Sequence, residues 1–184
     1  MDIRIREWTA DDEFEGTEVD GSFIVDSVLV LTLEDGRIGY AVEEVPRYTK
    51  RYEDEPDGET EDTGYAGYIG NPDQVMYLAC IGDKFAGQIQ LRKNWNGYAY
   101  VEDIKVDSAY RRYGVGRRLI DQAKNWAMAG RMPGIMLETQ NNNVRACKFY
   151  ESCGFVLGGF DTCLYKGLDK QNNEIALYWY LMFD

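Results

Sequence analysis

The chain has 184 residues, of which 45% are hydrophobic and 28% charged, and this composition predicts one globular domain over residues 1–184. A formal net charge of −12 argues against nucleic-acid partners and anionic membrane surfaces, because both require a positive field, and it favours cationic partners. No stretch is long and apolar enough for a membrane span, and the N-terminus has no apolar signal core, so we expect a cytoplasmic protein.

The N-terminal part of the chain predicts three strands and an acidic loop. A first strand is expected at residues 3–8, and residues 26–45 predict two strands around an Asp-Gly turn. Residues 53–62 hold seven acids in ten positions together with a proline and a glycine, which fits no regular element. We interpret this segment either as a solvated surface loop or as an acidic flap beside a cation-binding site.

The remainder of the chain predicts the order β, β, β, α, β, α, β, β from its hydrophobic periodicity. The first three strands are joined by short turns, one of them an Asn-Gly pair, so we expect them to be antiparallel. The predicted strands are 75–81, 85–93, 98–107, 134–140, 156–165 and 174–183, and the predicted helices are 115–130 and the segment from the Asn caps at 141–143 to Gly154. The apolar face of the first helix consists of Val115, Leu119, Ala123, Trp126 and Ala127.

The residue types present restrict the chemistry. The chain has no histidine, which removes the commonest general base, the Ser-His-Asp and Cys-His arrangements and most zinc sites, so we expect no metal site. Acid–base work must therefore fall to carboxylates, Tyr, Lys, Cys or water. The four cysteines lie in apolar or helical patterns and are expected to be reduced core residues: Cys80, Cys147, Cys153 and Cys163.

The segment RRYGVGRR, residues 111–118, places four arginines around two glycines between a predicted strand and a predicted helix. Gly114 and Gly116 let backbone N–H groups approach a ligand without interference from Cβ atoms, and the helix N-terminus adds a partial positive charge. The arginines can add charge-assisted hydrogen bonds. We interpret this turn as a phosphate-binding site; the alternative is a glycine-containing helix start with solvent-exposed arginines.

The spacing of this turn distinguishes it from two other phosphate-binding loops. The dinucleotide fingerprint needs a glycine where Leu119 stands, and a Walker loop needs a Gly-Lys-Ser/Thr sequence that is absent. The pattern Arg111-x-x-Gly114-x-Gly116 after an antiparallel strand resembles the acetyl-CoA pyrophosphate loop of the GNAT superfamily of N-acetyltransferases.

A second stretch also resembles this superfamily. NVRACKFYESCGF, at residues 143–155, is similar to the signature Asn-x-x-Ala-x-x-Phe-Tyr-x-x-x-Gly-Phe, and together the two motifs cover residues 98–155. The resemblance implies a mixed α/β (α+β) fold with a mostly antiparallel central sheet flanked by helices. The family usually has two helices after its first strand, where this chain predicts a hairpin.

The resemblance implies an acyltransferase that uses acetyl-CoA as co-substrate and acetylates an amine. Tyr150 corresponds to the tyrosine that protonates the departing thiolate, with a core aromatic as the alternative. Asn143 corresponds to a coenzyme contact, with a helix cap as the alternative. The implied coenzyme-binding residues are Ile104, Lys105, Val106, Arg111, Arg112, Tyr113, Gly114, Val115, Gly116, Arg117 and Asn143.

The proton acceptor for the incoming amine is expected among the carboxylates of the strand before the loop. Glu102 and Asp103 are the nearest, and they are expected to alternate between the two faces of that strand. We favour Glu102 as the base, because a carboxylate there can also pair with a substrate cation. The alternative for both residues is an ordinary solvent-facing strand position.

The whole chain resembles the streptothricin N-acetyltransferases, a group of GNAT resistance enzymes that acetylate the β-lysine moiety of that antibiotic. This resemblance implies a cationic small-molecule amine as acceptor and a role in antibiotic resistance. The alternatives are another amine, such as a polyamine, an aminoglycoside, a protein lysine or an N-terminus, and a non-catalytic acetyl-CoA sensor. The sequence is compatible with a monomer and with a homodimer.

Overall fold

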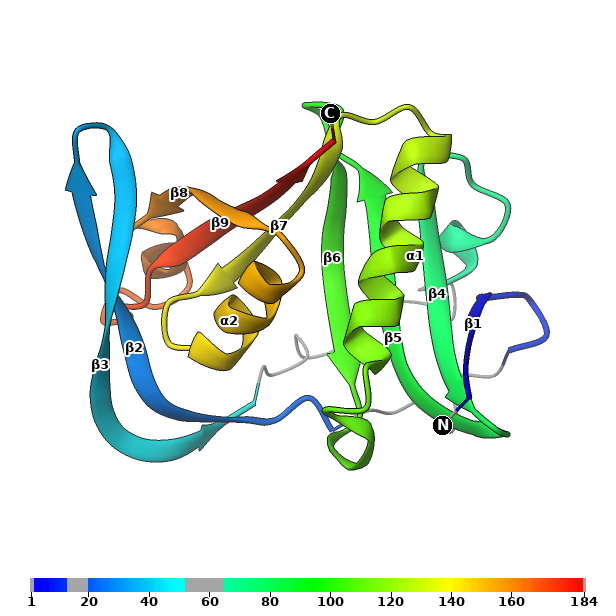
Figure 1. The fold of residues 1–184 in the computed structure, drawn as a ribbon, viewed down its shortest axis with the longest axis horizontal. Helices are drawn as coiled ribbons and strands as arrows, with labels where there is room; N and C mark the ends of the chain where they lie inside the picture. Colours follow the sequence, from blue (N-terminus) through cyan, green and yellow to red (C-terminus); the bar gives the residue numbers. More distant parts are fainter. Residues whose placement is uncertain (1, 13–19, 52–64, 184) are drawn as a thin grey trace. The chain divides into compact units, whose positions relative to one another are not determined.

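The computed structural model describes residues 2–12, 20–51 and 65–183. The acidic segment at residues 53–62 lies outside the described residues. The chain divides into two compact units, one comprising residues 1–21 and 52–135 and the other residues 22–51 and 136–184. Each unit contains antiparallel strands and one α-helix, so the predicted mixed, mostly antiparallel α/β fold is confirmed (Figure 1). No helix in the described ranges has the length and apolar character of a membrane span.

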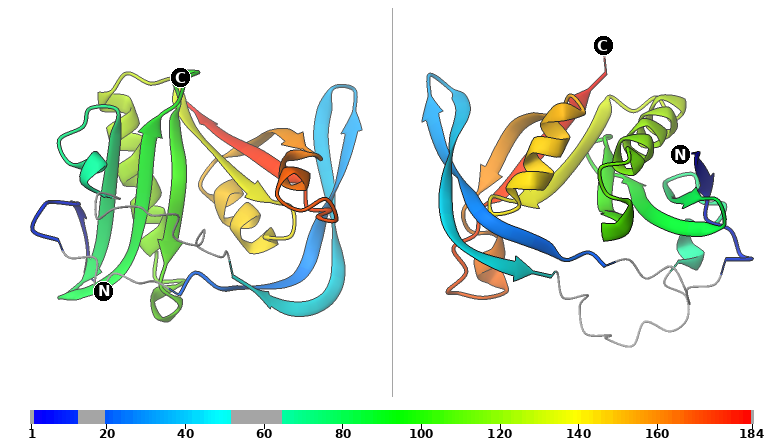
Figure 2. Two further views of the ribbon diagram at one scale, coloured as in Figure 1. Left: turned by 180° about the vertical axis from the view of Figure 1, so that it is seen from behind. Right: turned by 60° about the horizontal axis from the view of Figure 1, so that its bottom comes forward.

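The first unit is built on four strands in the order β1-β4-β5-β6, each antiparallel to the next. Helix α1 packs against all four strands, and Figures 1 and 2 show it crossing one face of this sheet. The elements of this unit are β1 (Ile3–Glu7), β4 (Gln74–Ile81), β5 (Lys84–Lys93), β6 (Ala99–Val106) and α1 (Val115–Ala129), with the 3-10 turns η1 (Ala66–Tyr68) and η2 (Ser108–Tyr110).

The apolar face of α1 forms the core of the first unit with the strands beneath it. Leu119 and Ala123 are fully buried, as predicted, and Ile120 joins them. Trp126 is only partly buried, because its position at the edge of the helical face leaves part of the indole in solvent. Burial of this face gives the unit its main stabilisation, since each large apolar side chain removed from water contributes about 1.5–3 kcal/mol.

The second unit contains a long hairpin and a second group of strands. Its elements are β2 (Phe23–Glu34), β3 (Arg37–Lys50), β7 (Gly134–Gln140), α2 (Val144–Ser152), β8 (Val156–Asp161), η3 (Leu164–Gly167) and β9 (Ala176–Met182), with β7, β9 and β8 adjacent in that order. The first two residues of β7 are grouped with the first unit. Both views of Figure 2 show the strong curvature of the hairpin, which has a β-bulge between Val25 and Ser27.

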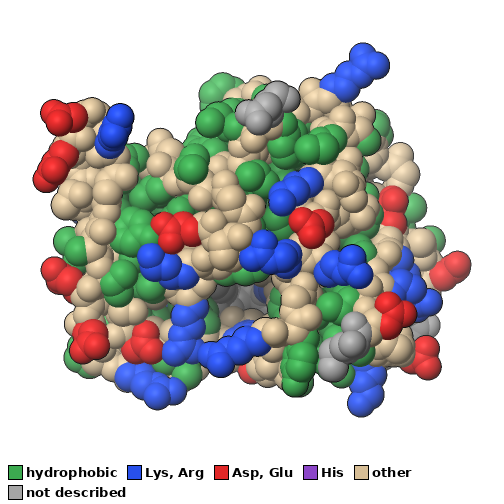
Figure 3. Space-filling model, viewed as in Figure 1, with side chains coloured by type: hydrophobic (Ala, Val, Ile, Leu, Met, Phe, Trp, Pro, Cys, Tyr) green, Lys and Arg blue, Asp and Glu red, His purple; other side chains and the backbone are tan. Residues whose placement is uncertain are grey.

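The predicted hairpin is confirmed and extends beyond residues 26–45 at both ends. Its tip has Asp35 and Gly36 at φ 50° and 73°, two consecutive left-handed residues of the kind that a tight hairpin turn requires. Acidic and basic side chains gather at this exposed tip (Figure 3). The hairpin therefore occupies the stretch of chain where the GNAT family usually has two helices.

Two predictions about the C-terminal part are wrong. The strand expected at 156–165 ends at Asp161, because the Asp161 carboxylate accepts hydrogen bonds from the N–H groups of Cys163 (2.7 Å) and Leu164 (3.1 Å) and turns the chain into η3. Cys163 is consequently exposed and is not a core residue. The other three cysteines are buried, and all four are free thiols.

Candidate active site

The glycine turn of the first unit has the backbone geometry of an anion site. Gly114 is the N-cap of α1 with φ 90°, and Arg112 also has a positive φ of 68°. The first helical hydrogen bond runs from the Arg118 N–H to the Gly114 carbonyl (3.1 Å), so the N–H groups of Val115 and Gly116 precede the helical ladder. Donors at a helix N-terminus favour a phosphate oxygen through both hydrogen bonding and the helix dipole. The turn therefore has the donors that an anion site requires, and its role in coenzyme binding stays a prediction.

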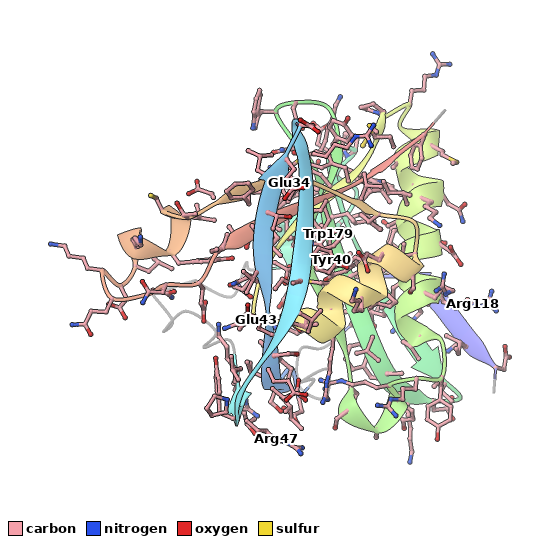
Figure 4. The ribbon with its side chains drawn as sticks, turned by 60° about the vertical axis from the view of Figure 1, so that its left-hand side comes forward. Glu34, Tyr40, Glu43, Arg47, Arg118 and Trp179 are labelled. Atoms are coloured by element: carbon pink, nitrogen blue, oxygen red, sulfur yellow. The ribbon has the colours of Figure 1, made fainter. Side chains whose placement is uncertain are left out.

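Arg111 holds the loop in place through backbone carbonyls. Its Nε donates to the Val106 carbonyl (3.1 Å) and its Nη2 donates to the Asp20 carbonyl (2.9 Å). The predicted coenzyme-binding residues Arg112, Tyr113 and Arg117 are exposed. Another of these predicted residues, Val115, is buried beneath the helix start. Arg118 is also exposed, on the first turn of α1 (Figure 4). The loop therefore presents several cations at the surface of a strongly acidic chain.

The strand that leads into this loop brings residues 104–106, which belong to the predicted coenzyme-binding set, next to β5. Residues 104–106 are partly buried. They pair with β5 in the register Ile104–Ile89, Lys105–Gln88 and Val106–Gly87. A Cβ atom at Gly87 would lie 2.5 Å from the Lys105 carbonyl oxygen, so glycine is needed for this close approach. The Asp107 side chain then accepts the Ala109 N–H (2.8 Å) and ends the strand.

Glu102 and Asp103 do not alternate as expected. Leu91 pairs with Val101 and Gln90 pairs with Asp103, so Glu102 is the extra residue of a β-bulge that interrupts the two-residue period. Asp103 accepts a hydrogen bond from the buried Gln88 (3.3 Å), and its carboxylate lies 3.7 Å from the Lys105 ammonium.

Both carboxylate oxygens of Glu102 are engaged. Oε1 lies 2.8 Å from the Arg92 Nε, and Oε2 accepts the Tyr68 hydroxyl at 2.6 Å. Burial and the nearby Glu102 carboxylate raise the pKa of Tyr68. The Arg92 guanidinium also lies over the Tyr100 ring, 4.8 Å from its centroid. The carboxylate that the sequence favours as the base is thus held by a cation and a hydroxyl.

Asn143 and Tyr150 belong to the second unit. Asn143 is the N-cap of α2, and its side chain accepts the Ala146 N–H (3.3 Å), which confirms the capping interpretation. Tyr150 is 7% exposed, and its ring contacts those of Phe149 and Phe155 at centroid distances of 5.5 and 5.8 Å. The roles of Asn143 in coenzyme binding and of Tyr150 as an acid stay predictions.

The second unit also contains a carboxylate cluster that the sequence analysis missed. Glu138 lies on β7 and accepts a hydrogen bond from the Tyr165 hydroxyl on η3. Burial raises the pKa of Glu138 to about 7, with the Glu174 carboxylate adding to the increase and Lys50 opposing it. Burial and the Glu138 carboxylate in turn raise the pKa of Tyr178 on β9.

Glu174 and Asn142 extend this cluster. Glu174 pairs with Lys50, and the two side chains are 23% and 20% exposed. Asn142 is 5% exposed, and its Nδ2 donates to Glu174 Oε1 at 2.8 Å and to the Tyr48 hydroxyl at 3.3 Å. Its Oδ1 is buried and has no hydrogen-bond partner among the described residues. We refer to Lys50, Glu138, Asn142, Tyr165 and Glu174 as the Glu138 cluster.

One signal in the sequence pointed to this cluster. Glu138 is the one charged residue of the mostly buried strand GIMLETQ, and a carboxylate in a buried strand needs a partner or a function. The other members of the Glu138 cluster carry no such signal, because Lys50, Tyr165 and Glu174 are distant from Glu138 in the sequence and Asn142 lies in a run of asparagines that predicts a helix cap. Among the described residues, no three His, Cys, Asp or Glu side chains are grouped as a metal ion requires.

Another tyrosine–glutamate pair in the second unit has a different environment. The Tyr40 hydroxyl on β3 donates to Glu151 on α2, and the Lys148 ammonium lies 2.5 Å from the Tyr40 hydroxyl and 3.2 Å from the Glu151 carboxylate. Figure 4 shows Tyr40 on the hairpin side that faces α2. This surface pair is neutralised by its own lysine.

The predicted site residues thus fall into two sets. Residues from Glu102 to Arg117 lie in the first unit on β6, the loop and the start of α1, whereas Asn143 and Tyr150 lie on α2 in the second. The chain matches the Acetyltransferase (GNAT) family over residues 39–155. This match includes parts of both units, so both sets of predicted site residues fall within it.

The chain is similar to several characterised and solved proteins over nearly its whole length. It is 37% identical to streptothricin acetyltransferase A of Bacillus subtilis (strain 168), over 88% of this chain and 89% of that protein. It is also 37% identical to a streptothricin acetyltransferase of Escherichia coli, over 90% and 88% of the two chains. A crystal structure from Bacillus anthracis strain Ames, described as a streptothricin acetyltransferase in complex with acetyl coenzyme A, is 53% identical with a TM-score of 0.90 and covers 100% of this chain and 99% of its own.

Proposed function

Because the chain belongs to the GNAT acetyltransferase family and is an acetyl-CoA-dependent N-acetyltransferase, we propose that its acceptor is an amine of streptothricin, on the β-lysine moiety, and that acetylation confers resistance. The observation that carries this proposal is the similarity to streptothricin acetyltransferases along almost the entire chain. That similarity includes the N-terminal part, where the hairpin replaces the usual helices.

The first unit supplies the coenzyme-binding surface in this proposal. The N–H groups at the start of α1 bind the pyrophosphate, and the exposed arginines Arg112 and Arg117 add charge at its rim. Arg111 contributes by holding the loop against the end of β6. The backbone of residues 104–106 binds the pantetheine arm.

The chemical steps require a proton donor for the thiolate and a proton acceptor for the amine. Tyr150 is assigned as the donor, since its burial beside Phe149 and Phe155 fixes the ring. Asn143 supports this assignment by capping the helix that carries Tyr150. For the amine proton, the candidate acceptors named from the sequence are Glu102 and Asp103.

The charge of the chain supports a cationic acceptor. A protein with a net charge of −12 attracts a polyamine-bearing antibiotic over long range, while the arginine and glycine loop provides the local exception for an anionic coenzyme. The acceptor in this proposal is a small molecule, and no nucleic-acid partner is invoked.

A turnover assay tests the proposal directly. Release of the CoA thiol is measured with streptothricin, aminoglycosides, polyamines and a lysine peptide as acceptors, and the mass of each product is determined. We expect acetylation of streptothricin with a kcat/KM at least tenfold above that for the other amines. Absence of streptothricin acetylation together with turnover of another amine contradicts the acceptor assignment and leaves the family assignment intact.

Salt dependence gives a second test, which concerns the attraction of the cationic acceptor to the acidic protein. The kcat/KM for streptothricin, measured with acetyl-CoA saturating, should fall as salt rises, because the Debye length shortens from about 10 Å at 0.1 M to about 3 Å at 1 M. Glu102→Gln should flatten this slope if Glu102 contributes to attraction of the acceptor. The matched control is Glu151→Gln, because that carboxylate is likewise paired with a cation, Lys148, but lies on α2 and outside the predicted site residues.

A further inference from the structure

The Glu138 cluster combines two carboxylates with one lysine that already has a partner. Lys50 pairs with Glu174, while Glu138 receives only the hydroxyl of Tyr165 among the hydrogen bonds of the described residues. Desolvating a carboxylate without a directly bonded cation is costly. The cluster would carry an excess negative charge with both acids ionised, and a second cation would compensate it.

Asn142 provides an independent indication that a ligand belongs in this cluster. The side chain is almost fully buried, and its Nδ2 contacts Glu174, so the carboxamide points into the cluster. Its unpaired Oδ1 is an acceptor that lacks a donor in the described part of the chain. Buried acceptors of this kind are normally satisfied, so a donor from outside the described residues is expected here, and an N–H group of a ligand can supply it.

We propose that the Glu138 cluster is the subsite for the acceptor amine, and that Glu138 is the base that removes its proton. A primary ammonium fits both requirements, because it supplies the compensating charge and three N–H donors for carboxylate and carboxamide oxygens. This inference rests on the proposed function, which it deepens by naming the proton acceptor.

The proton transfer balances within the established reaction. One N–H bond of the ammonium breaks, its electron pair stays on nitrogen, and a Glu138 oxygen gains the proton. The resulting neutral amine is the nucleophile for the acetyl group that acetyl-CoA supplies. Glu138 then returns its proton to water, so the overall change is ammonium plus acetyl-CoA to amide, CoA thiol and one proton.

The surroundings of Glu138 suit this role. A base works best when its pKa lies near the working pH, and burial together with Glu174 brings the pKa of Glu138 to about 7. The groups that face it are Lys50 from β3, Tyr165 from η3, Glu174 from the segment before β9, and Tyr178 from β9. Glu102 differs, because Arg92 and Tyr68 already engage both of its oxygens.

The test compares Glu138→Gln with Glu151→Gln, the matched variant of the other tyrosine–glutamate pair. With streptothricin as acceptor and acetyl-CoA saturating, Glu138→Gln should lower kcat/KM at pH 8 by about 10²-fold and abolish the rise in rate around pH 7. The loss should shrink towards pH 10, where the free amine no longer needs a base. Glu151→Gln should behave as wild type, and calorimetry should give an unchanged acetyl-CoA Kd for both variants.

Two further variants should shift the pH at which kcat/KM rises, in opposite directions. A purely structural role of Glu138 would not produce such shifts. Lys50→Met removes the cation that favours ionised Glu138 and should move the rise in kcat/KM to higher pH. Glu174→Gln removes the repelling carboxylate and should move it to lower pH. Wild-type rates and an unchanged pH profile in Glu138→Gln would overturn the proposal, as would a loss of acetyl-CoA affinity or of cooperative unfolding in that variant.

An acceptor-independent measurement separates this inference from the proposed function. The carboxyl resonances of glutamate labelled with carbon-13 can be titrated in the wild type, and the Glu138 signal identified by its absence in Glu138→Gln. A midpoint near pH 7 supports the inference even if streptothricin proves not to be the acceptor, and the kinetic comparison then uses the amine that is turned over. A midpoint near 4.5 contradicts it.

Discussion

Glu102 in the first unit and Glu138 in the second unit are held in opposite ways. In the first unit, Asp12 pairs with Arg6 and Glu102 pairs with Arg92, each through a guanidinium. In the second unit, Glu138 receives a neutral tyrosine hydroxyl and lies near another carboxylate. Asp12 and Glu102 are therefore neutralised before any ligand arrives, whereas the Glu138 cluster is left with an excess of negative charge.

The largest expected effect separates chemistry in the second unit from coenzyme binding in the first. Tyr150→Phe keeps the ring among Phe149 and Phe155 and deletes the hydroxyl. We expect kcat to fall by about 10²-fold or more while the acetyl-CoA Kd stays within twofold. Steady-state kinetics and calorimetry on the folded variant measure both values. Wild-type kcat in this variant would show that another group protonates the thiolate.

The next effect concerns the coenzyme loop alone. Gly114 adopts φ 90°, so a β-branched residue there strains the backbone that presents the N–H groups. Gly114→Val should raise the acetyl-CoA Kd by about tenfold or more, equivalent to about 1.4 kcal/mol.

Gly36 supplies the matched control for the loop. It also has a positive φ and nothing within 4 Å of a Cβ, but it lies at the hairpin tip in the second unit. Gly36→Val should lower stability in the same way and leave acetyl-CoA binding unchanged. Equal losses of affinity in the two variants would remove the loop from the coenzyme site.

A third prediction concerns the free energy of unfolding that is lost when Glu138, which has no directly bonded cation, becomes ionised. The folded-state pKa of Glu138, about 7, lies above the unfolded value of about 4.3, so its stability contribution is present below pH 4 and lost as pH rises through 7. Glu138→Gln should therefore be more stable than wild type at pH 8, by up to about 3 kcal/mol, and equal to it near pH 4. Urea unfolding at both values measures this difference. A destabilised variant at pH 8 would argue that Glu138 serves the fold.

The smallest effect has the opposite sign and comes from the first unit. The hydrogen bonds from Arg6 and Thr9 hold the pKa of Asp12 at about 2, below the unfolded value of about 3.9. Its contribution is thus present above pH 4 and lost as pH falls through 2. Asp12→Asn should cost about 0.5 kcal/mol at pH 7, because the Arg6 side chain is 39% exposed and screened by solvent. The difference should vanish near pH 2 in the same unfolding assay.

The sequence by itself determined the features that depend on local pattern. The α1 period, the Asp-Gly hairpin turn, the glycine turn after β6 and the Asn143 cap could all be predicted, because each arises from residues within a few positions of one another. The local pattern gave wrong predictions at two positions. The two-residue period of a strand indicates neither the bulge at Glu102 nor the early end of β8 at Asp161.

The tertiary structure alone decided which acids lack a cation. Whether a carboxylate is neutralised depends on what lies within a few ångströms of it, and those neighbours come from distant positions in the chain. Arg92 on β5 pairs with Glu102 on the neighbouring strand β6, whereas Glu138 meets Tyr165 from η3, Lys50 from β3 and Glu174 from the segment before β9. Folding therefore turned two glutamates that look alike in the sequence into one neutralised acid and one with a pKa of about 7.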